Sequence, residues 1–333
     1  MLVIAAPGQG AQTPGFLVPW LELPGFADRL AAWSELAGVD LIRAGTVADA
    51  DEIRDTAVAQ PLLVAAAIAA AEALTGEHVP LKGLNAVVAG HSVGELAAGA
   101  IAGAISAEDA MRLIRVRAEG MAAAAAITAT GMTAVLGGDE TEVLTALGKY
   151  GLTPANVNMA GQIVAAGTMD ELAALAADPP AGARLRPLSV AGAFHTRHMG
   201  PAVEALAAAA AQVPASDPVL PLLSDKDGAA VAAGTDWLER IVAQVSAPVR
   251  WDSCMQTMTR LGATALIELP PAGTLTGLAR RALRGVEVVA LKTPDDLPAA
   301  RALVAGAANG AANGSHDTNA PEPATRLQPD GGE

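Results

Sequence analysis

The chain has 333 residues, of which 52% are hydrophobic and 17% are charged. This is enough apolar material for a globular protein with a substantial core. The formal net charge of -14 argues against a nucleic-acid-binding protein, because phosphate binding depends on clustered lysine and arginine side chains. Aromatic residues make up only 2% of the chain, which is too few for base-stacking surfaces.

The chain contains one cysteine, Cys254, so no intramolecular disulfide can form. Residues 1–7 have neither the basic flank nor the long apolar run of a signal peptide. The most apolar stretch, residues 62–73, is shorter than the ~20 residues that a membrane-spanning helix needs. We therefore predict a cytoplasmic protein with no membrane span.

The first part of the chain predicts alternating buried strands and helices. Residues 2–6 form a short apolar run that stops at a glycine-rich turn, residues 7–10. Residues 61–73 predict a helix with its proline in the first turn. Residues 86–89 predict a second strand of the buried, parallel kind, and a helix follows it directly.

Residues 126–191 follow a different pattern, which predicts a small inserted domain. Strand, helix, strand, helix and strand are expected in that order at residues 132–136, 140–147, 162–166, 169–177 and 186–190. This order suggests helices packed on one face of an antiparallel sheet.

Beyond the insertion the earlier pattern resumes, with a helix expected at residues 201–212 and strands at residues 219–223, 265–268 and 286–290. A large domain would thus combine residues 1–125 and 192–304, on both sides of the insertion. After Val304 the sequence loses its periodicity and becomes rich in Ala, Gly and Asn. Residues 305–333 are therefore predicted to be a disordered tail.

The sequence Gly90-His91-Ser92-Val93-Gly94 matches the G-x-S-x-G nucleophile elbow, in which a tight strand-to-helix turn exposes a serine hydroxyl. The predicted strand before it and the predicted helix after it are the context that this motif requires. The amide of Val93 and the dipole of the following helix can both stabilise an oxyanion on an acyl intermediate. The motif therefore indicates that Ser92 is a nucleophile.

A serine nucleophile needs a base, and the chain has five histidines. His316 falls in the predicted tail, His78 in a solvated loop, and His91 beside the nucleophile, where consecutive side chains point apart. His195 and His198 remain, and elimination favours His195 without proving it. No acid is obvious as the third member of a triad, although a backbone carbonyl can also orient the imidazole.

Two further features could contribute to a site for an acyl substrate. The turn Gly8-Gln9-Gly10 could supply a second oxyanion donor from its backbone, and it does not complete a dinucleotide-binding G-x-G-x-x-G pattern. An arginine on the helix after Ser106 could bind a carboxylate in bidentate fashion. The candidates, which spacing does not separate, are Arg112, Arg115 and Arg117.

Taken together, these residues resemble the malonyl-CoA:acyl carrier protein transacylases and, more broadly, the acyltransferase domains of fatty acid and polyketide synthases. The resemblance covers about residues 3–295. The family's motifs occur in order at residues 7–12, 90–95, 112–117, 157–162, 192–196, 244–251 and 268–277. The sequence departs from the family at Pro270-Pro271, where Gly-Pro is more usual, and at Ala160, where proline is common.

The resemblance implies an α/β fold: an α/β-hydrolase-like large domain with a parallel sheet, and an inserted ferredoxin-like α+β domain. It implies that Ser92 is the nucleophile, His195 the base and acid, and Arg117 the clamp on the malonyl carboxylate. The backbone amides of Gln9 and Val93 would form the oxyanion hole. The other implied substrate-binding positions are His91, Asn158, Phe194 and Gln244.

In this family a main-chain carbonyl replaces the triad acid, and here it would come from the backbone around Gln244. Phe194 stands before the histidine as in malonyl-selective members, whereas methylmalonyl-selective members tend to carry a serine before the histidine. The phenyl ring would narrow the pocket at the α-carbon of the acyl group.

The implied activity is transfer of a malonyl group from malonyl-CoA to the phosphopantetheine thiol of an acyl carrier protein, through an ester on Ser92. No metal or redox cofactor is implied, and we expect a monomer. The product would supply fatty acid synthesis, polyketide synthesis or both. A serine esterase would not explain Arg117, and an inactive binding module would not need Ser92, His195 and Arg117 together.

Acyl carrier proteins are acidic, so an acidic enzyme should repel them at long range. Docking then requires a local basic patch. The candidate residues near the motifs are Arg184, Arg186, Arg197, Arg250, Arg280, Arg281 and Arg284.

Overall fold

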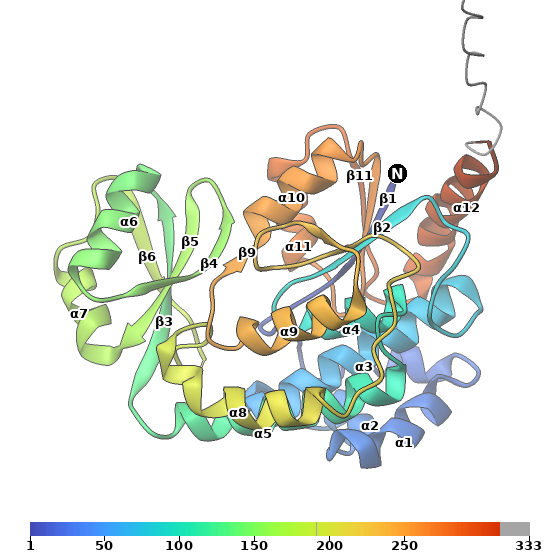
Figure 1. Cartoon of the computed structure of the whole chain (residues 1–333), viewed down its shortest axis with the longest axis horizontal. Coiled ribbons are helices and arrows are strands. Elements are labelled where there is room, and N and C mark those ends of the chain that lie inside the picture. Colours follow the sequence, from blue (N-terminus) through green and yellow to red (C-terminus); the bar gives the residue numbers. More distant parts are fainter. Residues whose placement is uncertain (191, 314–333) are drawn as a thin grey trace, which may run out of the picture.

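A computed structural model describes residues 1–190 and 192–313, and it contains two β-sheets (Figure 1). The larger sheet has the strand order β11-β10-β1-β2-β7-β8. All neighbouring strands in it are parallel except the β7–β8 pair. Its strands are β1 (Leu2–Ala6), β2 (Ala86–Gly90), β7 (Leu222–Leu223), β8 (Ala230–Val231), β10 (Ala265–Glu268) and β11 (Glu287–Ala290).

Helices cover both faces of the larger sheet, which explains why its central strands are continuous apolar runs. Alternate side chains of β1 enter different cores: Leu2 and Ile4 pack with the first, and Val3 with the second. The first core includes α3 (Thr56–Thr75) and α4 (Gly94–Ala102). The second includes α10 (Trp251–Arg260) and α11 (Thr274–Ala282).

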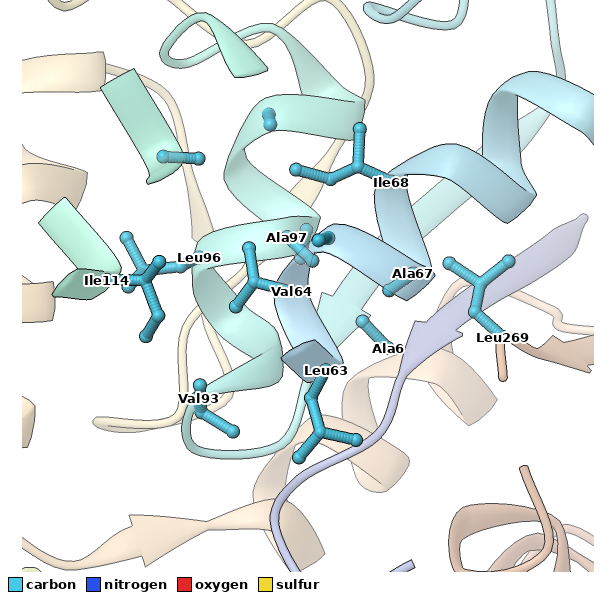
Figure 2. Packing of buried hydrophobic residues seen from close by; sticks show 14 of the residues in the cluster. Ala6, Leu63, Val64, Ala67, Ile68, Val93, Leu96, Ala97, Ile114 and Leu269 are labelled. Atoms are coloured by element: carbon cyan, nitrogen blue, oxygen red, sulfur yellow. The ribbon is translucent and has the colours of Figure 1, made fainter. Parts of the chain in front are cut away.

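The alanine-rich helices α3 and α4 pack closely beside β1, and this packing anchors the start of α4 (Figure 2). Leu63 and Val64 of α3 lie near Val93 and Leu96, on the turn and first part of α4. The Val93 side chain is buried, so it faces this core. Apolar contacts with α3 therefore hold the turn between β2 and α4 in place.

Helix α3 begins earlier than the sequence predicts. Asp55 caps it by accepting a hydrogen bond from the Ala57 amide, so Pro61 lies inside the helix and the prediction that it occupies the first turn is wrong. The helix is long and apolar enough to cross a membrane, but 83% of its apolar window is buried inside the protein. That burial is typical of the core helix of a globular protein.

The second sheet has the order β6-β3-β5-β4-β9, and only the β4–β9 pair is parallel. Its strands are β3 (Thr130–Gly137), β4 (Thr153–Met159), β5 (Gln162–Thr168), β6 (Ala183–Pro187) and β9 (Val249–Arg250). Its helices are α6 (Glu140–Lys149) and α7 (Met169–Ala177). The connectivity β-α-β-β-α-β is that of ferredoxin-like folds.

The sequence prediction omitted β4 and placed the last strand of this sheet at residues 186–190, whereas β6 ends at Pro187. The polar β4 contains Pro154 and a register shift, which hide the alternation expected of a strand. The division of the chain into domains at residues 126 and 191 remains a prediction.

The other helices enclose the larger sheet and connect it to the second one (Figure 1). They are α1 (Phe26–Ala37), α2 (Leu41–Thr46), α5 (Ala107–Ala125), α8 (Gly200–Ala210), α9 (Gly234–Gln244) and α12 (Leu297–Asn313). Short 3₁₀ helices occur at Pro19–Glu22, Glu52–Arg54, Arg197–Met199 and Pro294–Asp296. The strand predicted at residues 219–223 is reduced to the two residues of β7.

Helix α12 corrects the prediction that disorder begins at residue 305. The helix continues to Asn313, because alanine favours helix and because tertiary contacts support this segment. The Ala307 carbonyl accepts a hydrogen bond from the Asn85 amide, and Arg301 donates to the carbonyls of Ala73 and Leu74. The rest of the predicted tail, residues 314–333, lies outside the described residues.

Candidate active site

Ser92 lies at the sharp turn between β2 and α4 and has a left-handed backbone with φ 53°. A non-glycine residue in this conformation costs about 1–3 kcal/mol and persists only where its surroundings enforce it. A Cβ on Gly90 would lie 2.1 Å from the Gly94 carbonyl carbon, and one on Gly94 would lie 2.3 Å from the Ala6 oxygen. Gly90 is therefore needed for the tightness of the turn, and Gly94 for its close approach to the end of β1.

The imidazole of His195, the base that the sequence analysis favoured, lies beside Ser92. Its Nε2 lies 2.7 Å from Ser92 Oγ, and its Nδ1 lies 2.8 Å from the main-chain oxygen of Gln244. Because that carbonyl can only accept, Nδ1 carries the hydrogen and Nε2 is free to accept the serine proton. Burial and the nearby charge of Arg117 lower the pKa of His195 to about 3, which keeps the ring neutral at neutral pH.

Arg117 is the arginine of its helix that reaches the site, and only 1% of it is exposed. Its two terminal nitrogens donate to amide oxygens, at 2.6 Å to Gln60 Oε1 and 2.9 Å to Gln244 Oε1. One of them, Nη2, also lies 3.4 Å from Ser92 Oγ. In contrast, Arg112 and Arg115 form surface ion pairs with carboxylates of α5.

The guanidinium of Arg117 can accept an anionic ligand. Each terminal nitrogen carries two hydrogens and uses one on a neutral amide. The second hydrogen of Nη2 makes only a long, 3.4 Å bond to Ser92 Oγ, which a carboxylate bound by Nη1 and Nη2 would replace. Burial lowers the pKa of Arg117 to about 10, while the charges of Glu95 and Asp225 act in the opposite direction. The group therefore stays positive at neutral pH.

Of the two expected oxyanion donors, Gln9 lines the same cavity as Ser92, and Val93 follows Ser92 in the chain. Among the hydrogen bonds of the described residues, none is donated by the backbone amide of Gln9 or of Val93. The Gln9 side chain donates to the Arg54 carbonyl at 3.3 Å, which helps to fix the turn after β1. The first glycine of that turn, Gly8, packs on the elbow: a Cβ there would lie 2.8 Å from His91 Nδ1.

His91 connects the elbow to the second sheet. Its Nε2 lies 2.9 Å from Asn158 Oδ1 on β4, and its ring meets Trp251 edge-on, with 5.7 Å between centroids. Burial lowers the pKa of His91, so the ring is neutral at neutral pH. His91 and Asn158 thus hold the two sheets together at the site.

A small cavity of about 90 Å³ opens beside Ser92. Its lining comes from the turns after β1 and β2, from helices α3 and α5, and from the second sheet and the loop that follows it. The lining residues are Gln9, Gln60, His91, Ser92, Met121, Met132, Asn156, Leu188, Val190, Phe194 and His195. Of the residues expected at the site, Arg117 and Gln244 join it through their hydrogen bonds. Asn158 reaches it only through His91, and Val93 directs its side chain into the core.

Sequence reasoning missed Gln60, Met121 and the role of two buried carboxyl groups, Glu95 and Asp225. Glu95 ends the elbow motif, whereas Gln60 and Asp225 lie in segments with no motif. Burial raises the pKa of Glu95 to about 7, although hydrogen bonds from Asp225 and Gln244 act in the opposite direction. Burial and the nearby Glu95 raise the pKa of Asp225 well above its usual value. The described residues contain no group of three or more His, Cys, Asp or Glu side chains arranged to hold a metal ion.

The candidate docking arginines separate into two groups. Arg197 pairs with Glu171 and Arg250 with Asp252. The exposed remainder are Arg184, Arg186, Arg280, Arg281 and Arg284. Arg281 of α11 donates to Gln162 Oε1 on the second sheet at 2.9 Å, so these arginines extend across both sheets.

This combination of an elbow serine, a histidine oriented by a carbonyl and a buried arginine fits an acyl-transferring enzyme, and comparison with known proteins agrees. Residues 5–309 match the acyl transferase domain family. The malonyl CoA-acyl carrier protein transacylase of Mycobacterium tuberculosis is 55% identical over 297 residues, which are 89% of this chain and 98% of that protein.

Solved structures give the same result. The crystal structure of MCAT from Mycobacterium tuberculosis is 52% identical, with a TM-score of 0.86 over 90% of this chain and 99% of that chain. A type II PKS acyl-carrier protein in complex with its malonyl-transacylase matches at 27% identity and a TM-score of 0.83, over 91% of this chain and 99% of that chain. The chain therefore belongs to the acyl transferase domain family and, within it, to the malonyl-CoA:acyl carrier protein transacylases.

Proposed function

We propose that this chain transfers a malonyl group from malonyl-CoA to the phosphopantetheine thiol of an acyl carrier protein, in two half-reactions joined by an ester on Ser92. The observation that carries the proposal is the placement of Arg117 Nη2 3.4 Å from Ser92 Oγ, in a buried site. A carboxylate bound by Nη1 and Nη2 of this guanidinium would lie beside the nucleophile.

In the first half-reaction His195 Nε2 takes the proton of Ser92 Oγ as this oxygen attacks the thioester carbonyl. The backbone amides of Gln9 and Val93 would stabilise the oxyanion of the tetrahedral intermediate. Collapse breaks the carbon–sulfur bond, and the leaving CoA thiolate takes the proton from His195. The product of this half-reaction is malonyl-Ser92.

In the second half-reaction the carrier's thiol gives its proton to His195 and attacks the ester carbonyl. The carbon–oxygen bond breaks, and Ser92 Oγ recovers the proton from His195. The Gln244 carbonyl keeps the imidazole in the correct tautomer in both half-reactions, in the place of a triad carboxylate. All steps are proton and acyl transfers, so the mechanism calls on no redox cofactor or metal.

Phe194 lines the cavity next to the reacting serine and is proposed to limit the substituent on the α-carbon. The small size of this cavity supports a preference for malonyl over methylmalonyl groups. We further propose that the protein acts as a monomer in the cytoplasm and serves fatty acid synthesis, polyketide synthesis or both.

The proposal is tested by incubating the protein with malonyl-CoA, acetyl-CoA or methylmalonyl-CoA, with and without a phosphopantetheinylated carrier protein, and measuring intact masses. We expect a malonyl adduct on Ser92 that disappears when the carrier is added, as the carrier gains the same mass. An adduct that is lost only to water, with no gain on the carrier, would identify a hydrolase instead.

A further inference from the structure

A pair of buried carboxyl groups lies behind the catalytic serine. Glu95 is 1% exposed and Asp225 is 0% exposed. Asp225 follows β7 by two residues, just as Ser92 follows β2 by two residues. Because β2 and β7 are parallel neighbours, with Val88 paired to Leu222, the topology brings the two residues to the same sheet edge.

Asp225 holds the backbone of the nucleophile. Its Oδ2 accepts a hydrogen bond from the Ser92 amide at 2.6 Å. At 2.6 Å this bond is short for a backbone N–H donor, so the carboxyl oxygen holds the amide closely. It acts on the residue whose left-handed backbone requires external support, with φ 53°.

The same oxygen also helps to hold Gln244. Asp225 Oδ2 lies 3.1 Å from Gln244 Nε2, and Glu95 Oε2 lies 2.6 Å from it. Glu95 Oε2 in turn accepts a bond from the Asp225 amide at 3.3 Å. The two carboxyl groups thus fix the orientation of the Gln244 amide, with its nitrogen toward them and its oxygen toward Arg117.

Gln244 connects these contacts to the reacting groups. Its main-chain oxygen orients His195, its Oε1 accepts from Arg117, and its Nε2 also donates to the Ser92 carbonyl at 3.1 Å. Displacement of Gln244 would therefore disturb the base, the guanidinium and the nucleophile together. Asp225 itself forms no contact with His195 that would make it a triad acid, since the Nδ1 bond goes to Gln244.

We propose that Asp225, supported by Glu95, is a positioning residue that aligns Ser92 and His195 by holding the Ser92 amide and the Gln244 side chain. The inference rests on the proposed function, since it concerns the same acylation step. The essential property of Asp225 is an acceptor oxygen at the position of Oδ2. An asparagine can place its own oxygen there, whereas an alanine cannot.

The test compares Asp225→Asn, Asp225→Ala and a control, Glu72→Ala, by rapid-quench intact mass with malonyl-CoA and acetyl-CoA. Glu72 is a suitable control because it is also buried and accepts a backbone hydrogen bond, from Val79, but lies at the far end of α3. Rates are divided by the folded fraction, which is measured by circular dichroism.

We expect Asp225→Ala to lower the maximal acylation rate about 100-fold for both substrates, with KM nearly unchanged, because misalignment affects the reacting atoms. Asp225→Asn should retain the rate within about tenfold, since it restores the acceptor. Glu72→Ala should lower the melting temperature and leave the acylation rate unchanged. If Asp225→Ala does not fold, Glu95→Met removes the second contact of Gln244 Nε2 and should lower the rate about tenfold.

Three outcomes would overturn the inference. A wild-type acylation rate in Asp225→Ala would exclude a positioning role. If Asp225→Ala does not fold, a wild-type rate in Glu95→Met would exclude it. An Asp225→Asn variant as slow as Asp225→Ala shows that charge, not the acceptor, is required. A loss confined to malonyl-CoA shows an effect through Arg117 alone. Lack of any ester on Ser92 in the wild type would instead overturn the proposed function.

Discussion

His195 Nδ1 lies 2.8 Å from the main-chain oxygen of Gln244, at the position where a serine hydrolase presents a carboxylate. A neutral carbonyl fixes the tautomer of the imidazole but stabilises the imidazolium less than a carboxylate would. The buried carboxyl groups of the site are directed instead to the Ser92 amide and the Gln244 side chain. Negative charge is thereby kept from direct contact with the guanidinium of Arg117, which remains available to an anionic acyl group.

Replacement of the proposed nucleophile gives the first prediction. Ser92→Ala should abolish covalent malonylation and leave the fold intact, because the hydroxyl contributes only hydrogen bonds with His195 and Arg117 and fills no part of the core. Intact mass spectrometry after incubation with malonyl-CoA measures the adduct, and circular dichroism checks the fold. A normal adduct on this variant would mean that another residue carries the acyl group.

The second prediction concerns selectivity for the carboxylate. Arg117→Ala should lose malonyl transfer by about 100-fold or more, because a buried charge-assisted pair contributes a few kcal/mol. Acetyl transfer should be retained or rise, since a neutral acetyl group does not use the guanidinium. The kcat/KM values for malonyl-CoA and acetyl-CoA measure this change in preference.

Arg115→Ala is the matched control for this experiment. It removes an arginine from the same helix, but one that is paired with Glu119 on the surface. Its preference for malonyl-CoA should equal that of the wild type. A proportional loss of both activities in Arg117→Ala would assign Arg117 a structural role.

The third prediction is a pH dependence of stability that originates at Glu95. Burial raises its pKa to about 7 in the folded protein, above its usual value near 4.5, so the folded state retains a proton that the unfolded state releases. Stability from this group is therefore present below about pH 4.5 and is lost as the pH rises through about 7. The ionisable groups around it are Asp225, Arg117 and Cys254.

The measurement compares wild type and Glu95→Gln, which carries no charge at any pH. Between about pH 5 and about pH 8 the wild type should lose on the order of 2 kcal/mol of unfolding free energy relative to the variant. His195 acts in the opposite direction, since its lowered pKa destabilises the fold as the pH falls below about 6.5. Its contribution is the same in both proteins and cancels. Parallel pH profiles in urea unfolding would contradict the prediction.

Much of this fold could be predicted because local patterns and tertiary structure agree. The predicted strand at residues 265–268 and the predicted helix at residues 169–177 coincide with β10 and α7. The elbow was predictable because its two glycines are required by contacts within the motif and with the adjacent strand. In contrast, β4 pairs on one side with β9, and α12 accepts a hydrogen bond from the Asn85 amide, so both depend on partners that are distant in the sequence.

The same reason explains what was missed at the site. Arg117 was one of three candidates, yet it shares the buried face of α5 with Ile114 and Met121, at helical spacing, and this pattern could have selected it. Asp225 gives no such signal. Its proximity to Ser92 depends on the pairing of β2 with β7, which local sequence does not encode.

The last prediction addresses how an acidic chain receives an acidic carrier protein. The exposed Arg280 and Arg281 lie on α11, and Arg281 also reaches Gln162 of the second sheet. We expect Arg280→Glu combined with Arg281→Glu to raise the KM for carrier protein about tenfold. The reason is that charges at the edge of an interface mainly control the rate at which the two proteins associate. Malonylation of Ser92 by malonyl-CoA should stay nearly unchanged. Added salt should slow the wild type more than the variant, because salt screens the attraction between these arginines and the carrier protein, and the variant no longer has that attraction. The control, Arg112→Glu with Arg115→Glu, makes the same change in net charge on α5, so it separates a local patch from a general charge effect. Equal carrier kinetics in the α11 variant and the wild type at low salt would place the docking surface elsewhere.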